Sequence, residues 1–179
     1  AAIAHLWFET IHPFSDGNGR IGRALVEHVF ARAEALPMSL SRQIERDKRG
    51  YYAALQAGRR PGRIGNAVGI DATPFVLWFL QTLAEAAAAA RSEVLFLIRR
   101  NHYLARVDSQ ITARQKQVLQ RLFDQGPERV DQGLSAKSYG KIAKVSGPTA
   151  TRDLAAMVAA GALRKGAGGG RSTRYLLTL

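Results

Sequence analysis

The sequence predicts a mainly α-helical protein with two domains, the second of which ends in a short β-hairpin. Two observations support this. Apolar residues recur at helical spacing through most of the chain, and the last third consists of short capped segments followed by a run of glycines. A chain of 179 residues can hold one medium or two small domains. We expect domains at residues 1–103 and 112–179, a linker at 104–111, and no β-structure besides the terminal hairpin.

Two helices are expected on either side of a turn at residues 12–19. Each has apolar residues along one face, at the spacing of an amphipathic helix. These residues are Ile3, Leu6, Trp7 and Ile11 before the turn, and Ile21, Leu25, Val26 and Val29 after it. Phe14, within the turn, is expected to be buried.

Two longer stretches complete the first domain. The first is residues 41–55. In the second, Asp71 with Pro74 marks the start of a long helix with a dense apolar face. The alanine-rich run at 84–90 is expected to end that helix, and a further helix to continue through Leu104.

Three capped helices are expected in the second domain. Thr112, Ser135 and the turn at 146–148 precede them, and Gly161 ends the third. Their inward apolar residues are Val118, Leu119, Leu122, Phe123, Tyr139, Ile142, Ala143, Leu154, Met157 and Val158. Residues 162–165 and 171–177, on either side of three glycines, then predict the two-stranded hairpin.

Residues 12–23 bring together the groups that a phosphate-binding site needs. Gly17 and Gly19 let the backbone curl through positive φ, so that successive N–H groups form a concavity for an anion at a helix start. Arg20 and Arg23 are neighbours on that helix start, where cations are unfavourable unless an anion lies among them. The pattern favours a polyphosphate ligand.

Two more side chains of this segment suggest chemistry. Asp16 offers the hard oxygen that Mg²⁺ prefers, and this ion is commonly held by one or two carboxylates together with substrate phosphates. His12 carries an imidazole that titrates near neutrality, which suits it to accept a proton from an attacking hydroxyl. The sequence therefore predicts a site for phosphoryl or nucleotidyl transfer.

The segment His-Pro-Phe-Ser-Asp-Gly-Asn-Gly-Arg-Ile-Gly-Arg resembles the Fic family signature, H-P-F-x-[D/E]-G-N-G-R-x-x-R, at every defined position. The resemblance implies a Fic-type helical core and a protein adenylyltransferase, which moves AMP from ATP to a Ser, Thr or Tyr hydroxyl of a protein target. It also implies these roles: His12 as the general base, Asp16 as the Mg²⁺ ligand, Gly17, Asn18 and Gly19 around the phosphates, and Arg20 and Arg23 on the outer phosphates.

Three features refine this expectation. Related Doc-type kinases carry a lysine where this chain has Gly19, so AMP transfer is favoured over phosphate transfer. Fic proteins place several helices and a β-hairpin flap ahead of the motif, so we expect this chain to be a fragment, truncated at its N-terminus, of a longer protein. The family's inhibitory Ser/Thr-x-x-x-Glu-Gly/Asn pattern is not met, because Ser41 to Glu45 is followed by Arg46.

The helix expected at 41–55 looks like the helix that helps to form the base pocket in many Fic proteins. The adjacent rings of Tyr51 and Tyr52 could stack on adenine there, and packing of both rings in the core is the alternative. The other histidines, at positions 5, 28 and 102, lack metal-ligating neighbours and are expected to be structural.

The second domain is strongly basic. Residues 104–179 carry 13 Lys and Arg against 5 Asp and Glu, whereas residues 1–103 carry 13 against 9. The order of helices and hairpin resembles a winged helix-turn-helix, which implies a third helix in the major groove of double-stranded DNA. The candidate contacts are Thr149, Thr151 and Arg152 to bases, and Lys141, Lys144, Arg171 and Arg174 to phosphates. Protein contacts or dimerisation are the alternative use of such a module.

The composition argues against a membrane protein and against a secreted, disulfide-bonded protein. Apolar runs fall short of the ~20 residues of a membrane span and cysteine is lacking, so we expect a cytoplasmic protein without membrane contact, signal peptide or disulfides. Two functional alternatives stay open. One is a DNA-binding regulator whose Fic part senses ATP with little transfer, and the other is a Fic enzyme that removes AMP or transfers another nucleotide. A homo-oligomer is compatible with either.

Overall fold

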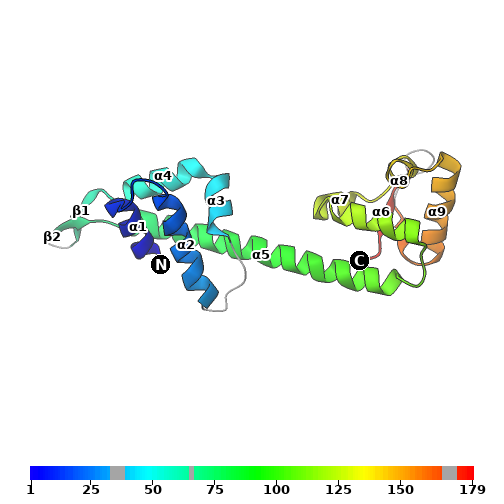
Figure 1. Ribbon diagram of the computed structural model, residues 1–179, viewed down its shortest axis with the longest axis horizontal. Helices are drawn as coiled ribbons and strands as arrows, with labels where there is room; N and C mark the ends of the chain where they lie inside the picture. Colours follow the sequence, from blue (N-terminus) through cyan, green and yellow to red (C-terminus); the bar gives the residue numbers. More distant parts are fainter. Residues whose placement is uncertain (33–38, 65–66, 167–172) are drawn as a thin grey trace. The chain divides into compact units, whose positions relative to one another are not determined.

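The computed structural model of the protein describes residues 1–32, 39–64, 67–166 and 173–179. It is mainly helical, which confirms the predicted fold class (Figure 1). The chain separates into two compact units, Ala1–Glu93 and Val94–Leu179. None of the helices in the described ranges is long and apolar enough to cross a lipid bilayer.

The first unit is built from helices, a two-stranded hairpin and the first part of a long helix. Its elements are α1 (Ala2–Ile11), α2 (Asn18–Arg32), α3 (Leu40–Arg46), α4 (Lys48–Ala57), β1 (Pro61–Ile64), β2 (Ala67–Ile70) and the first part of α5 (Thr73–Val107). Its core consists of Leu6, Val26, Leu40, Ile44, Tyr51, Ala54, Leu55, Phe75 and Phe79. α1 packs against α2, and the chain then passes through α3 and α4 to the hairpin (Figure 1).

The hairpin of β1 and β2 corrects the expectation that the terminal hairpin is the only β-structure. The two strands are antiparallel, with Pro61 paired to Ile70 and Gly62 to Gly69. The sequence does contain a hairpin signal, a Gly-Asn pair between short segments with β-branched residues.

The helix expected at 41–55 is two helices, because Asp47 interrupts it. Asp47 has φ −134° and ψ 65°, outside the helical region, and it ends α3. Its carboxylate then accepts a hydrogen bond of 2.9 Å from the Gly50 N–H and so caps α4. A separate helix, α4, therefore begins after Asp47, and its residues line one wall of a pocket.

α5 is one continuous helix of 35 residues, so the alanine-rich run does not end it. Alanine has the highest helix propensity and propagates a helix rather than stopping it. The division between the units also differs from the expected linker at 104–111. It falls between Glu93 and Val94, and Tyr103, Val107 and Ile111 are buried in the core of the second unit.

The second unit contains the end of α5 and the elements α6 (Ala113–Phe123), α7 (Pro127–Gln132), α8 (Ala136–Ala143), α9 (Gly147–Ala159), β3 (Leu163–Lys165) and β4 (Tyr175–Leu177). The predicted starts of α6 and α8 are confirmed, since Thr112 and Ser135 each form a capping box. α9 ends before Gly161, which has φ 70°. The short helix α7 was not predicted from the sequence.

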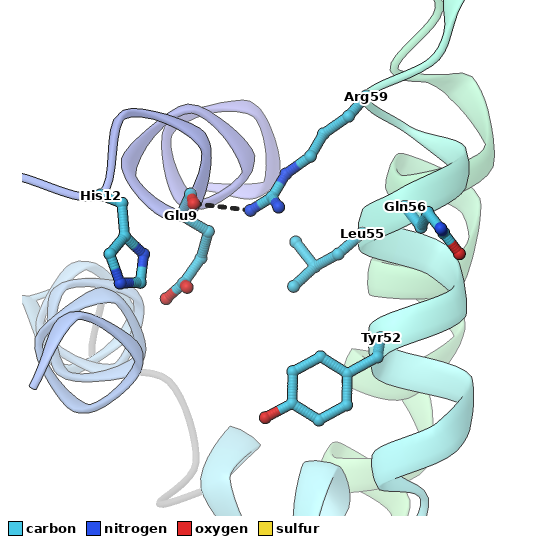
Figure 2. A pocket seen from close by; sticks show the side chains of 6 residues that line it. All are labelled: Glu9, His12, Tyr52, Leu55, Gln56 and Arg59. Carbon is cyan, nitrogen blue, oxygen red and sulfur yellow. Dashed lines mark hydrogen bonds between the residues drawn. The ribbon is translucent and has the colours of Figure 1, made fainter.

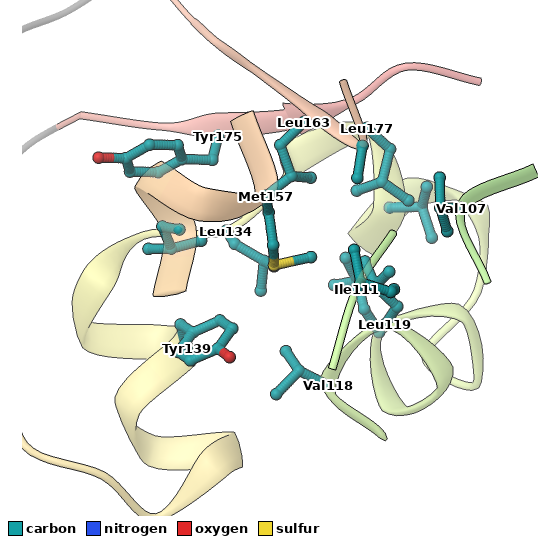
Figure 3. Close-up of a cluster of buried hydrophobic side chains, with 14 of the residues drawn as sticks. Val107, Ile111, Val118, Leu119, Leu134, Tyr139, Met157, Leu163, Tyr175 and Leu177 are labelled. Atoms are coloured by element: carbon teal, nitrogen blue, oxygen red, sulfur yellow. The ribbon is translucent and has the colours of Figure 1, made fainter. Parts of the chain in front are cut away.

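The core of the second unit forms from the predicted inward residues of its helices. Leu119, Leu122, Tyr139, Leu154 and Met157 are fully buried. They are joined by residues from α5 and from the two strands, and Figure 3 shows these side chains converging on one interior. β3 and β4 pair antiparallel, as the predicted hairpin requires, and Leu163 lies opposite Leu177. The glycine turn expected at 168–170 lies outside the described residues.

A hydrogen-bonded network fixes α9 to the other helices of this unit. The buried carboxylate of Asp153 accepts two hydrogen bonds from Arg114, of 2.9 and 3.1 Å, and one of 2.9 Å from the Tyr139 hydroxyl. The Gln115 amide donates to the Asp153 backbone carbonyl. Burial alone would raise the pKa of Asp153, but the hydrogen bonds from Arg114 and Tyr139 outweigh it and hold that pKa below its ordinary value.

The apolar faces of α1 and α2 are largely uncovered. Leu6 and Val26 are buried, but Ile3, Trp7, Ile11, Ile21, Leu25 and Val29 are exposed. Phe14 is 51% exposed, so the expectation that it is buried is wrong. Its ring is tilted against that of Phe8, with 6.3 Å between ring centroids and 47° between the ring planes.

Candidate functional site

His12 ends α1 in an unusual backbone conformation. Its φ of 51° and ψ of 57° are left-handed, which is uncommon for a residue other than glycine. Its N–H still donates to the Phe8 carbonyl at 3.0 Å, so the residue caps the helix. Such outliers persist only where the surroundings impose them, and they cluster at functional sites. The side chain is exposed and lines a pocket.

Asn18 holds the turn that follows His12. Its side chain is buried, with 2% of the residue exposed, and it bonds both polar backbone groups of Phe14. The Phe14 N–H donates to Asn18 Oδ1 at 3.0 Å, and Asn18 Nδ2 donates to the Phe14 carbonyl. The Asn18 side chain therefore holds the turn together through both of its polar atoms.

Gly17 and Gly19 shape the start of α2. Gly17 has φ 83°, which a side chain would strain. At Gly19, a Cβ would lie only 3.1 Å from Nη1 of Arg23, so glycine lets this half-buried arginine approach the backbone. Gly19 lies within α2 and does not share the positive φ of Gly17, so the expectation that both glycines curl the backbone holds for Gly17 alone. The first N–H groups of a helix have no partner within the helix.

Asp16 and Arg20 form an exposed ion pair at the mouth of this turn. Arg20 Nη2 lies 3.3 Å from Asp16 Oδ2, and Asp16 Oδ1 accepts a 2.6 Å hydrogen bond from the Gly17 N–H. Exposed pairs of this kind contribute little to stability, so both groups can turn to a ligand at little cost. A single carboxylate beside a phosphate turn fits Mg²⁺. Within the described ranges, His, Asp and Glu side chains do not gather in threes as a metal site.

A pocket of about 260 Å³ lies beside the turn (Figure 2). It is lined by Glu9, His12, Tyr52, Leu55, Gln56 and Arg59. In Figure 2 the carboxylate of Glu9 and the imidazole of His12 face Tyr52 and Leu55 across the space. Arg59 ties the two walls together, because its Nη2 donates to the Glu9 carbonyl at 2.6 Å and its Nε to Thr10 Oγ1 at 3.0 Å.

The two tyrosines have different environments, so they cannot both stack on one base. Tyr51 is 3% exposed and packs on Trp78, with 5.4 Å between ring centroids. Its hydroxyl lies 3.1 Å from Nε2 of His5, and burial raises the pKa of that hydroxyl well above its usual value. Tyr52 is 65% exposed and lines the pocket. The ring of Tyr52 is therefore the one available to a base.

Sequence reasoning missed Glu9, Gln56 and Arg59 as pocket residues. A signal for the latter two exists, since Tyr52, Gln56 and Arg59 follow one another at helical spacing and share one face of α4 and its end. Glu9 gave no comparable signal. A lone acidic residue in an apolar helix is usually solvated, and only the packing of α1 on α2 shows that Glu9 is buried.

Several basic residues of the second unit lie on α8, in the turn before α9 and on α9 itself. Lys141, Lys144, Thr151 and Arg152 are exposed, and Arg174 is exposed at the start of β4. Lys144 stands in the left-handed turn between α8 and α9, with φ 55°. The Thr151 hydroxyl donates to the Gly147 carbonyl at 3.0 Å, and Thr149 Oγ1 pairs with Ser146 Oγ, so both hydroxyls are engaged in the first turns of the helix. Arg171 lies outside the described residues.

The turn and its flanking helices are similar in sequence to segments of known proteins. Residues 1–30 match the Fic/DOC family. This segment covers α1, the turn that begins at His12 and most of α2. A stretch of 56 residues is also 43% identical to proteins named "Protein adenylyltransferase Fic" from Aedes aegypti and Culex quinquefasciatus. The stretch is 31% of this chain and spans about a tenth of the length of each relative, 11%.

Proposed function

We propose that the chain carries the catalytic segment of a protein adenylyltransferase, which transfers AMP from ATP to a Ser, Thr or Tyr hydroxyl of a protein target. The observation that carries the proposal is the turn itself. Asn18 clamps it, Gly17 curls it through positive φ, and the left-handed His12 presents an imidazole to the adjoining pocket. A phosphate turn next to a general base and a pocket with an exposed aromatic ring suits a nucleotide.

The chemistry follows from these positions. The target hydroxyl attacks the α-phosphorus of ATP as His12 takes its proton. The bond between the α-phosphorus and the bridging oxygen breaks, and pyrophosphate leaves. The backbone N–H groups at the start of α2, together with Arg20 and Arg23, neutralise the charge on the phosphates. Asp16 would hold Mg²⁺, which neutralises further phosphate charge when bound.

The nucleobase is assigned to the pocket wall on α4. Tyr52 offers an exposed ring face, and Leu55 adds apolar surface beside it. A stacked base contributes about 1–3 kcal/mol of binding by comparison with alanine variants of other proteins. The arrangement is tolerant of the base's identity, because every base has a π-face. Transfer of another nucleotide, or removal of AMP, would therefore use the same residues.

The test separates catalysis from binding. ATP binding is measured by calorimetry and AMP transfer by label from the α-phosphate, for the wild type and for His12→Ala. We expect transfer to fall at least about 100-fold with ATP affinity changed less than about 3-fold, because loss of a general base typically costs 10²–10⁴ in rate. His28→Ala is the matched control, since that histidine is exposed on α2 outside the turn. Transfer that persists in His12→Ala would contradict the assigned role.

A second candidate function is supported by the basic residues around α9. We propose that the second unit binds double-stranded DNA, with Arg152 of α9 toward the bases and Lys141, Lys144 and Arg174 on phosphates. In that case the chain is a regulator, and its first unit senses ATP or modifies a DNA-bound partner. Affinity for a duplex should fall steeply as salt rises, and each lysine or arginine that contacts a phosphate adds about one to the slope.

The two candidates make different predictions for one pair of variants. Lys141→Ala with Lys144→Ala should weaken duplex binding at every sequence and leave AMP transfer unchanged. His12→Ala should do the reverse. If the double lysine variant binds DNA as the wild type does, the second unit does not use this face for DNA. If the wild type itself does not bind a duplex, protein contacts become the better account of the module.

A further inference from the structure

Glu9 is a buried carboxylate without a complete set of partners. The residue is 8% exposed, and its Oε1 atom has no hydrogen-bond partner within the described part of the chain. An ionised carboxylate can only accept hydrogen bonds, and a buried acceptor without a donor lowers stability. Within the described residues, the Nδ1 atom of His5 is also buried without a partner, and it lies 3.1 Å from the Cβ position on Gly22 that Oε1 approaches at 2.8 Å, so Oε1 faces α2 and His5. Glu9 also lines the pocket, where a ligand can donate to its carboxylate.

The position of Glu9 joins the phosphate turn to the pocket. Its Oε1 atom lies 2.8 Å from the place of a Cβ on Gly22 and 3.9 Å from that of a Cβ on Gly19, so it touches the first turn of α2. Glu9 is also one of the residues that line the pocket, where it lies opposite Tyr52 and Leu55 (Figure 2). Of the pocket residues that the structure describes, Glu9 is the one recorded beside the glycines of α2.

The order of groups along a nucleotide then assigns a partner to Glu9. With the phosphates in the turn of Gly17 to Arg20 and the base on Tyr52, the sugar lies between them, beside Glu9. We propose that the Glu9 carboxylate accepts hydrogen bonds from the ribose hydroxyls and so selects ribonucleotides over deoxyribonucleotides. The inference rests on the proposed nucleotide site. A carboxylate on the ribose hydroxyls is also the solution used by dinucleotide-binding folds.

The charges around Glu9 make this arrangement compatible with a polyphosphate. Arg59 donates to the Glu9 backbone carbonyl at 2.6 Å, and Arg23 Nη1 lies 3.1 Å from the same Gly19 Cβ position that Glu9 approaches. These guanidinium groups offset the negative charge of the carboxylate near the phosphates. Burial lowers the pKa of the neighbouring His5 imidazole, although a backbone hydrogen bond with Gly22 and the charge of Glu9 act to raise it.

The experiment uses ligands that differ by one group each. Calorimetry measures the affinity of the chain for ATP, 2′-deoxy-ATP, 3′-deoxy-ATP and purine riboside triphosphate, which lacks the amino group of adenine. We expect nucleotide binding to weaken about 10- to 100-fold when the hydroxyl that donates a hydrogen bond to Glu9 is removed, as for a lost hydrogen bond to a charged group. Removal of the amino group should change the affinity less than about 3-fold.

Variants connect the effect to this residue. In Glu9→Gln, which keeps the shape of the side chain but not its charge, the preference for the ribonucleotide should shrink to below about 5-fold. Glu85→Gln, an exposed glutamate on α5, should keep the full preference. Circular dichroism checks that each variant is folded. If Glu9→Gln does not fold, the ligand series on the wild type still tests the proposal.

The outcomes separate this inference from the function on which it rests. Equal affinity of the wild type for ATP and both deoxy analogues would overturn the role of Glu9 and leave the nucleotide site intact. A penalty confined to the ligand without the amino group would also overturn it, because Glu9 would then face the base. Failure of the wild type to bind any nucleotide would overturn the proposed function itself.

Discussion

Replacement of Asp153 tests whether the network behind α9 holds the second unit together. Asp153 receives three side-chain hydrogen bonds, two from Arg114 and one from the fully buried Tyr139. Asp153→Asn keeps the volume but removes the charge. A hydrogen bond to a charged group contributes about 1.5–3 kcal/mol. The contacts from Arg114 are discounted, because 44% of its side chain is exposed. We therefore expect a loss of about 2 kcal/mol in the free energy of unfolding.

The assay can follow the two units separately, because the two tryptophans, Trp7 and Trp78, both lie in the first unit. Urea unfolding of Asp153→Asn should shift the transition seen by circular dichroism to lower urea, with little change in the transition seen by tryptophan fluorescence. Asp131→Asn, which removes an exposed carboxylate of α7, is the control. A shift of less than about 0.5 kcal/mol for Asp153→Asn would refute the reasoning.

The same variant has a predictable pH dependence. The pKa of Asp153 in the folded protein lies below the ordinary value of 3.8, so its ionised form is favoured by folding. Its contribution is complete above the unfolded pKa, from about pH 5 upward, and is lost as the pH falls through the lower folded pKa. The stability difference between wild type and variant should therefore be constant from pH 5 to 8 and shrink below about pH 4.

Variants at three further positions test the site. Gly17→Ala puts a side chain at φ 83°, which costs about 1–2 kcal/mol, so ATP affinity measured by calorimetry should fall about 10-fold; an unchanged affinity would mean that the turn is not the phosphate site. Asn18→Ala removes both hydrogen bonds to Phe14 and should abolish AMP transfer even where the fold is intact by circular dichroism, whereas activity near that of the wild type would show that the clamp is dispensable. Tyr52→Ala should weaken ATP binding about 5- to 100-fold through lost stacking, and Tyr52→Phe should bind as the wild type does.

Local signals predicted the backbone of the turn better than they predicted its surroundings. Glycine spacing and the helix start after the turn depend on residues close in sequence, and the structure has both, with Gly17 at positive φ and α2 beginning at Asn18. The capping boxes at Thr112 and Ser135 were predictable for the same reason. The role of each side chain within the turn could not be predicted from these local signals. The inward, clamping orientation of Asn18 appears only once the backbone path of Phe14 is known.

Burial was predicted less well, because it depends on what lies against each helix. Phe14, Ile21 and Leu25 are apolar at helical or turn positions, yet the structure leaves them exposed. Conversely, Glu9 is charged but lies beneath the start of α2. Spacing along one helix shows that a face is apolar, and it does not show which neighbour covers that face.

The most direct test of the account supplies the chain with Mg²⁺ and ATP labelled at either the α- or the γ-phosphate, with His12→Ala in parallel. The proposed function predicts α-label on a protein hydroxyl, released pyrophosphate, and no protein-bound label from the γ-position. Retention of γ-label would show phosphate transfer instead. No label on any protein from the wild type, under conditions in which calorimetry shows bound ATP, would contradict the transferase and favour the DNA-binding regulator.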